Sequence, residues 1–98
     1  MLFGMIHTLR NPTEQTDRRT LNLFTNWTPP QGFEFKSHYE FSDGGGGMAT
    51  VEVTLPEAMY EAIAPYRDTL EFKLVPIVEV SVAVPILQKG QAWADSID

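Results

Sequence analysis

The sequence predicts an α+β fold in which a four-stranded antiparallel sheet carries two helices on one face. Residues 2–8 are apolar at almost every position, as expected of a strand that is covered on both faces. Residues 33–41 and 48–55 alternate apolar and polar side chains with period two, which is typical of strands. Helix-start signals follow the first and the third of these strands. The resulting order, β-α-β-β-α-β, is that of a ferredoxin-like fold.

Two helices are indicated by capping residues and prolines. The first is expected to begin at Asn11, which can cap the helix ahead of Pro12, and to run to about Asn26. The second has a Thr-x-x-Glu capping box that starts at Thr54, and Pro65 ends it. Apolar residues recur at helical spacing in both segments, so each helix has one face to pack against the sheet.

The last strand is expected to run from about residue 71 to 82. It contains Pro76, which cannot donate to a ladder, so the strand lies at a sheet edge or carries a bulge there. We divide the chain into a ferredoxin-like domain, residues 1–82, and a C-terminal helical arm, residues 83–98. Trp93 on this arm needs an apolar surface, either on its own subunit or on a partner.

Four consecutive glycines, Gly44 to Gly47, raise the question of a phosphate-binding loop. Such a loop leads from a strand into a helix, whose N-terminus offers free N–H groups. Here the glycines lead into a strand pattern, and no lysine follows them as a Walker-type loop requires. We therefore predict that Asp43 and the four glycines form the tip of a β-hairpin.

The composition excludes several classes of function. The formal net charge is −6 and the sequence pI is about 4.7, which argues against nucleic acid and against an anionic membrane surface as partners. There is no cysteine, so disulfides, thiolate catalysis and cysteine-based zinc sites are excluded. The N-terminus lacks a basic region and a long apolar stretch, and a cytoplasmic protein is expected.

The sheet has a second face that this chain is too short to cover. Both helices of the predicted fold lie on one face, and 98 residues leave little material for the other. The first strand nevertheless reads as buried on both sides. A second copy of the chain is the simplest cover, because symmetric homodimers are the commonest oligomers. We therefore expect a homodimer.

A family resemblance is carried by three stretches: MLFGMIHTLRNP at the start, PPQGFEFKSHYEFSDGGGGMATVEV in the middle and YRDTLEFKLVPIVEV near the end. The chain resembles the dimeric α/β-barrel superfamily and, within it, a family of short bacterial proteins classed as a domain of unknown function. The resemblance implies a dimer whose two sheets face each other as a barrel. The superfamily includes cofactor-free quinol monooxygenases, muconolactone isomerase, haem-degrading enzymes and chlorite dismutase-like proteins, so the fold does not fix a function.

Strand pairing predicts which side chains line a cavity between the two sheets of such a dimer. Pairing Ser42 with Met48 across the hairpin tip would place His38 beside Glu52, on the face opposite the helices. A slip of one residue would send the aromatic side chains into the cavity and His38 away from it. The residues assigned to the cavity are Phe3, Met5, His7, Thr50 and Glu52.

The candidates for chemistry are His7, His38 and Glu52. A histidine beside a carboxylate can act as an acid–base pair, and the alternative is a cross-strand ion pair at a wet interface. Two histidines and one carboxylate are also the ligand set of a non-haem iron site, but nothing in their spacing is diagnostic. We therefore predict neither a metal site nor a cofactor.

Three functions remain open. The protein binds a small hydrophobic or aromatic molecule between the sheets, transforms such a molecule without a bound cofactor, or is a structural or assembly protein whose barrel is filled by side chains. The phenylalanine and methionine content of the first strand favours a lipophilic guest if a cavity exists.

Overall fold

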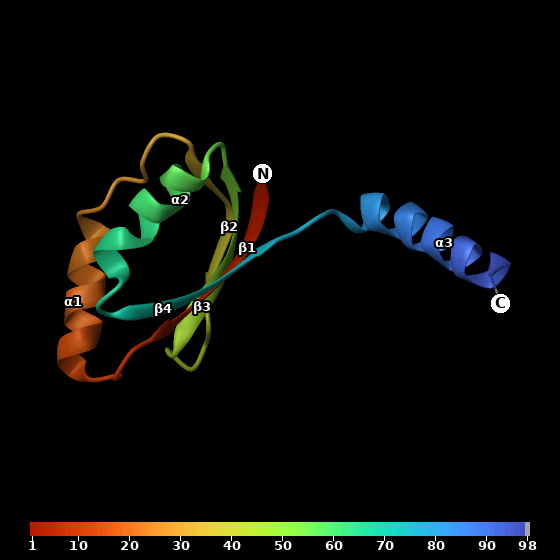
Figure 1. Ribbon diagram of the computed structural model, residues 1–98. Helices are drawn as coiled ribbons and strands as arrows, with labels where there is room; N and C mark the ends of the chain where they lie inside the picture. Colours follow the sequence, from red (N-terminus) through yellow and green to blue (C-terminus); the bar gives the residue numbers. More distant parts are fainter. Residues whose placement is uncertain (98) are drawn as a thin grey trace.

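The computed structural model describes residues 1–97 and shows one antiparallel sheet with two helices on one face and a third helix that projects away (Figure 1). The strands lie in the order β2-β3-β1-β4. The predicted α+β class and the ferredoxin-like order of elements are confirmed. The elements are β1 (Leu2–Leu9), α1 (Glu14–Thr25), β2 (Phe33–Glu40), β3 (Gly46–Val53), α2 (Pro56–Ile63), the 3₁₀ turn η1 (Ala64–Tyr66), β4 (Leu70–Pro76) and α3 (Val80–Ser96).

The two helices on the sheet begin one or two residues later than predicted. Thr13 caps α1, since its hydroxyl accepts a hydrogen bond from the Thr16 amide at 3.1 Å. Asn11 has a positive φ of 45° and forms part of the turn instead, so its assignment as the cap was wrong. The capping box at Thr54 was also wrong: Leu55 occupies the N-cap of α2 and its side chain makes no capping hydrogen bond to the described residues.

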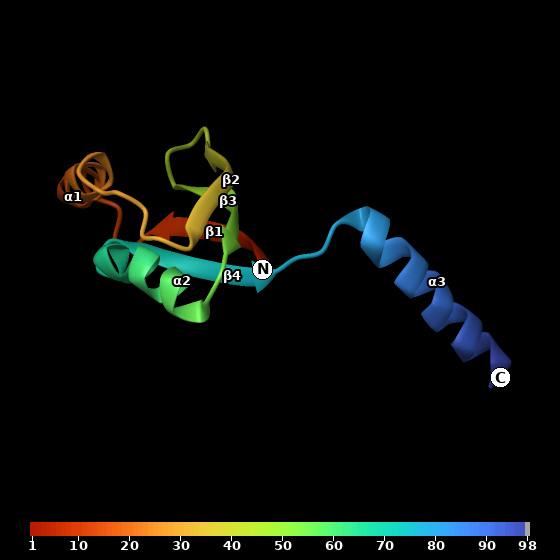
Figure 2. The same ribbon diagram turned by 90° about the horizontal axis from the view of Figure 1, so that it is seen from above.

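The core lies between the sheet and α2. Residues from three strands and one helix form a single buried cluster: Met5, Phe33, Ala49, Val51, Val53, Ala58, Met59 and Ala62. By contrast α1, every residue of which the structure describes, buries no side chain. Viewed from above, α1 lies farther from the strands than α2 does (Figure 2). The sheet and α2 therefore form the packed part of the molecule, and α1 is held loosely beside it.

The two faces of β1 are the reverse of the prediction. Met5 pairs with Ala49 and His7 pairs with Gly47, which places both side chains on the buried, helix-facing side of the sheet. Phe3 shares that side, and Leu2 and Ile6 face away, on what we call the open face of the sheet. The error has a physical cause: both faces of β1 are apolar, so alternation alone does not fix which one meets the core.

A β-bulge in β2 overturns the predicted hairpin register. Phe35 pairs with Val51 but Ser37 pairs with Thr50, so Lys36 is an extra residue in the ladder. Beyond the bulge the alternation is shifted by one. His38 therefore lies opposite Ala49 on the helix-facing side, and the predicted placement of His38 beside Glu52 was wrong.

Three further contacts complete that correction. Tyr39, and not Ser42, pairs with Met48, and both side chains lie on the open face. Glu52 lies opposite Glu34, also on the open face. Its carboxylate accepts a hydrogen bond from the N-terminal amine of Met1 at 2.7 Å. The predicted cross-strand His38–Glu52 pair is therefore replaced by an ion pair with the chain terminus.

The last strand is shorter than predicted. It ends at Pro76 and lies at the sheet edge, as the proline requires, but α3 already begins at Val80 where we expected strand up to residue 82. The neighbouring strand β1 begins at Leu2, whose carbonyl accepts a hydrogen bond from the Ile77 amide at 3.0 Å. Farther along the chain a strand would have no partner on β1. The predicted boundary after residue 82 thus falls inside α3, and no helix of the described residues has the length and apolar character needed to cross a bilayer.

Candidate functional site

A cavity of about 490 Å³ lies between the helix-facing side of the sheet and the helix layer. The loosely held α1 forms one wall, through Leu21 and Phe24, and leaves space above the sheet because it buries no side chain of its own among the described residues. Its lining includes exposed residues, among them Asp17 and Glu40, so the cavity is open to solvent. Its walls include the aromatic residues Phe24, Trp27, Phe33, Phe35, Tyr66 and Phe72, and Tyr39 lies at its margin.

The aromatic walls are ordered by edge-to-face contacts around Trp27. Its ring centroid lies 6.1 Å from those of Phe33 and Phe35 and 5.4 Å from that of Tyr66, with interplanar angles between 71° and 85°. Such contacts are favourable beyond the area that they bury. The segment after α1 is thus fixed to β2 and to η1 through one side chain, and this end of the cavity has a defined shape.

Two histidines from different strands meet at the cavity. His7 lies on β1 and His38 on β2, with β3 between them. Their Nε2 atoms are 3.4 Å apart, and Glu40 Oε1 lies 4.0 Å from His7 Nε2. The contact across β3 depends on Gly47, because a Cβ atom at that position would lie 2.8 Å from two atoms of the His7 ring. Because glycine has no side chain, the His7 ring can extend across β3 toward β2.

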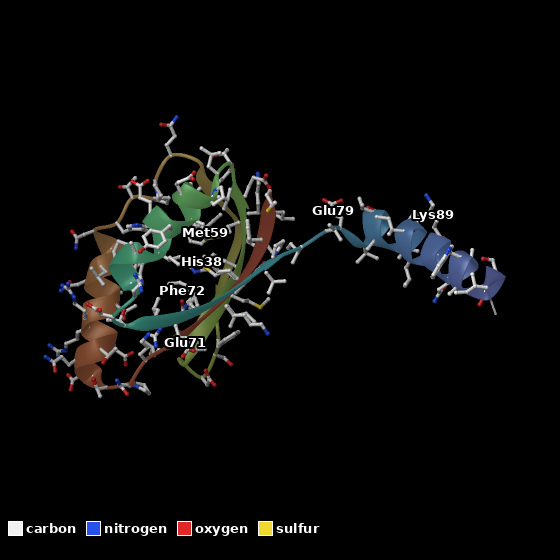
Figure 3. The ribbon with its side chains drawn as sticks, in the orientation of Figure 1. His38, Met59, Glu71, Phe72, Glu79 and Lys89 are labelled. Atoms are coloured by element: carbon white, nitrogen blue, oxygen red, sulfur yellow. The ribbon has the colours of Figure 1, made fainter. Side chains whose placement is uncertain are left out.

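His38 owes its position to the bulge at Lys36. The shift brings His38 onto the same face as Phe35, and the two rings stack with centroids 4.4 Å apart and an interplanar angle of 4°. Phe24 meets the His38 ring edge-on from α1 at 5.8 Å. Figure 3 shows His38 and Phe72 pointing from the sheet toward the helices. The imidazole of His38 is therefore held by two aromatic rings, and its Nε2 atom is directed toward His7.

The surroundings of His7 keep its ring neutral at pH 7. Burial lowers the pKa of His7 below its usual 6.5, the nearby Glu40 carboxylate opposes this, and His38 adds to the lowering. A neutral imidazole has one donor and one acceptor nitrogen. His7 Nε2 faces His38 and Glu40, whereas Nδ1 is buried without a hydrogen-bond partner among residues 1–97.

Tyr66 presents a second polar group without a partner. Its side chain is buried and its hydroxyl makes no hydrogen bond within the described part of the chain. Burial raises the pKa of Tyr66 to about 12, because the phenolate would lose its hydration there. The phenol is therefore uncharged at any physiological pH.

The structure brings together only part of the predicted set of site residues. Met5 and His7 line the cavity on the helix side, and Phe3 packs against the neighbouring core. Thr50 and Glu52 lie on the open face, where the Thr50 hydroxyl is 2.7 Å from that of Ser37. Of the three candidates for chemistry, His7 and His38 meet and Glu52 is absent from their surroundings.

Glu40 was missed, although the sequence carried a signal for it. Residues two apart in a strand share a face whatever the register, so His38 and Glu40 had to point the same way. The prediction depended instead on the partner across the hairpin, which the bulge changes. Same-strand spacing was the more robust evidence.

Comparison with known proteins supports a family but not an activity. No curated protein matches the chain. Residues 1–91 match the family model described as "Domain of unknown function (DUF3303)". The match spans all four strands, both helices of the domain and much of α3, including residues beyond 82 that we had set apart as an extension. The chain therefore belongs to the DUF3303 family, a domain of unknown function.

Proposed function

We propose that the protein binds a small hydrophobic or aromatic molecule in the cavity between the sheet and the helices. The observation that supports this is the cavity itself: about 490 Å³ within a chain of 98 residues, with aromatic walls and a polar group of two histidines and one carboxylate. Small-molecule sites are usually apolar hollows of about 300–1,000 Å³ in which a few polar groups fix the orientation of the ligand.

The charges around the cavity disfavour an anionic ligand. Asp17 and Glu40 both line it and both are exposed, so an anion would be repelled as it approached. The imidazoles of His7 and His38 can each donate or accept a hydrogen bond. A compact ring compound with one hydroxyl or amino group would stack on the aromatic walls and direct its polar group to the histidines.

A homodimer is compatible with this site and belongs to the same proposal. We had expected the ligand between the two sheets of a dimer, whereas this cavity lies on the opposite side of the sheet from the open face. A second copy that covered the open face would leave the cavity accessible. The alternative, a structural protein without a ligand, predicts no saturable binding at this position.

The two tryptophans of the chain allow a direct test. Trp27 lines the cavity and Trp93 lies on α3, away from it. In a Trp93→Phe variant, titration with 4-bromophenol should quench the fluorescence of Trp27 along a saturable curve, because bromine quenches on contact. In the matched Trp27→Phe variant, which reports Trp93, quenching should rise linearly with concentration. Linear quenching in both variants would contradict the proposal.

A wall residue provides the second arm of the test. Phe24 is 46% exposed, so Phe24→Ala removes a cavity wall with less loss of buried surface than a change at Phe33 or Tyr66 would cause. Bromophenol binding, followed through Trp27, should weaken several-fold because the ring that also touches His38 is gone. Leu55→Ala, at a side chain that is 61% exposed and does not line the cavity, should leave binding unchanged.

A further inference from the structure

We propose that His7, His38 and Glu40 bind one divalent transition-metal ion at the cavity. One ligand atom from each of the three side chains lies within 4.8 Å of the other two. Imidazole and carboxylate groups in a two-to-one ratio suit Zn²⁺ and Fe²⁺, whereas Mg²⁺ and Ca²⁺ prefer oxygen ligands alone. This inference goes beyond the binding of a ring compound and does not depend on it.

The distance between the two imidazoles fits a shared ion. Two nitrogens that each lie about 2.1 Å from a tetrahedral zinc ion are about 3.4 Å apart. The Nε2 atoms of His7 and His38 are separated by 3.4 Å. Glu40 Oε1 is slightly farther away, 4.0 Å from His7 Nε2, but its side chain is 70% exposed and free to rotate toward the ion. The site therefore needs one surface side chain to move, and no change of backbone.

Two unrelated features of the fold bring the two histidines together. The absence of a side chain at Gly47 lets the His7 ring extend over β3, and the bulge at Lys36 turns His38 inward. Stacking on Phe35 then fixes the His38 ring. A site with three protein ligands leaves a fourth position for water or another ligand. All three residues line the cavity, so that position faces the space where a ring compound would lie.

One feature limits the expected affinity. A histidine that binds a metal through Nε2 carries its proton on Nδ1, and outer partners of such N–H groups typically contribute about 10–100-fold to metal affinity. His7 Nδ1 is buried and has no hydrogen-bond partner among residues 1–97. We therefore expect binding of moderate strength, readily removed by a chelator.

Calorimetric titration of the untagged protein with Zn²⁺ provides the first test. We expect one ion per chain. His38→Gln and Glu40→Gln should each weaken binding by at least about tenfold, since direct ligands matter no less than their outer partners. Glu34→Gln is the matched control: it removes an exposed carboxylate from the same strand, but from the open face. Absence of saturable binding, or equal affinities in all four proteins, would overturn the proposal.

Imidazole nuclear magnetic resonance provides the second test and does not depend on the variants being fully folded. The chain has two histidines, so every imidazole signal belongs to the proposed site. One equivalent of Zn²⁺ should shift the ¹⁵N signals of both rings together. A shift of one ring alone, or a gradual shift without saturation, would show surface binding to the acidic chain and refute the site. Repeating the bromophenol titration with chelator present separates this outcome from failure of the proposed ring-compound binding.

Discussion

At the scale of single residues, Tyr66 contributes an aromatic ring to the cavity wall but also buries a polar hydroxyl group. Its side chain is 5% exposed and packs edge-on against Trp27, yet its hydroxyl has no partner within the described residues. A buried polar group without a hydrogen bond costs roughly 1–3 kcal/mol. The ring of Tyr66 therefore stabilises the fold, and the hydroxyl opposes it.

Replacing Tyr66 with phenylalanine should separate these two contributions. At pH 7 the Tyr66→Phe variant should be as stable as the wild type or more stable by up to about 1 kcal/mol, because it keeps the ring and loses the unpaired hydroxyl. Urea denaturation of both proteins measures this. A loss of more than about 1 kcal/mol would show that the hydroxyl has a partner after all.

The wild-type protein should also show a loss of stability at high pH that the variant lacks. The pKa of Tyr66 is raised to about 12 in the folded protein, above the value of about 10 in an unfolded chain. Below about pH 10 the phenol is neutral in both the folded and the unfolded state, so its ionisation does not affect stability. Between about pH 10 and 12 only the unfolded chain ionises, and the folded state loses on the order of 2 kcal/mol of stability. Wild-type protein should lose more stability than Tyr66→Phe over that interval. Parallel losses would place Tyr66 in contact with water.

At the scale of elements, the hairpin between β2 and β3 divides the four glycines into two pairs. Gly44 has a positive φ of 77°, and the Gly45 amide donates a hydrogen bond to Asp43 Oδ1 at 2.8 Å, so these two form the turn. Gly46 and Gly47 belong to β3. The predicted hairpin is confirmed, but its tip lies two residues earlier than predicted, at residues 41–45. Gly46 and Gly47 instead allow close packing against His7 and its neighbours.

Two changes in this hairpin should therefore have opposite consequences. Inserting one glycine after Gly44 should cost less than about 0.6 kcal/mol, because lengthening a flexible turn by one residue adds little closure entropy. Gly47→Ala should cost roughly 1–3 kcal/mol, since its Cβ would lie 2.4 Å from the Tyr39 carbonyl oxygen and 2.8 Å from the His7 ring. Chemical denaturation compares the two. Similar losses would mean that turn and strand glycines are equivalent.

The elements were predictable because their signals are local, and the site was not, because its geometry depends on pairing. Alternation, prolines and helical spacing lie within single segments, and they indicated every strand and helix of the sheet domain. The choice of face on β1 needed a comparison of Leu2 and Ile6 with Phe3 and Met5, and both pairs are apolar. No residue pattern around Lys36 indicates the bulge. Same-face contacts across strands were therefore beyond what one sequence specifies.

At the scale of the whole molecule, two apolar surfaces have no cover within residues 1–97. The radius of gyration is 17.6 Å, against about 13 Å for a compact chain of this length, because α3 projects from the domain (Figures 1 and 2). Its large side chains are exposed, among them Leu87 and Trp93. On the open face of the sheet Ile6, Tyr39 and Met48 are exposed as well. Patches of this kind usually mark association, and a second copy is the simplest partner.

Sedimentation equilibrium at micromolar concentration should therefore give about twice the chain mass of 11.0 kDa. Met48→Lys places a charge on the open face and should shift the equilibrium toward monomer, because an unpaired charge in an apolar interface is costly. Leu55→Lys, at an exposed position that caps α2 and lies outside the four strands, should leave the mass unchanged. A monomeric wild type would refute the homodimer.

The extra residue in β2 has a consequence for how this chain tolerates genetic change. Loss of the single codon for Lys36 would remove the unpaired residue and leave every other pair of the β2–β3 ladder in place. His38 and Glu40 would stay on the helix-facing side and Tyr39 on the open face, although the strand would be one residue shorter. Regular pairing that kept Lys36 would instead turn His38 and Glu40 outward. We therefore expect β2 to tolerate an in-frame deletion of this one triplet without an exchange of its two surfaces.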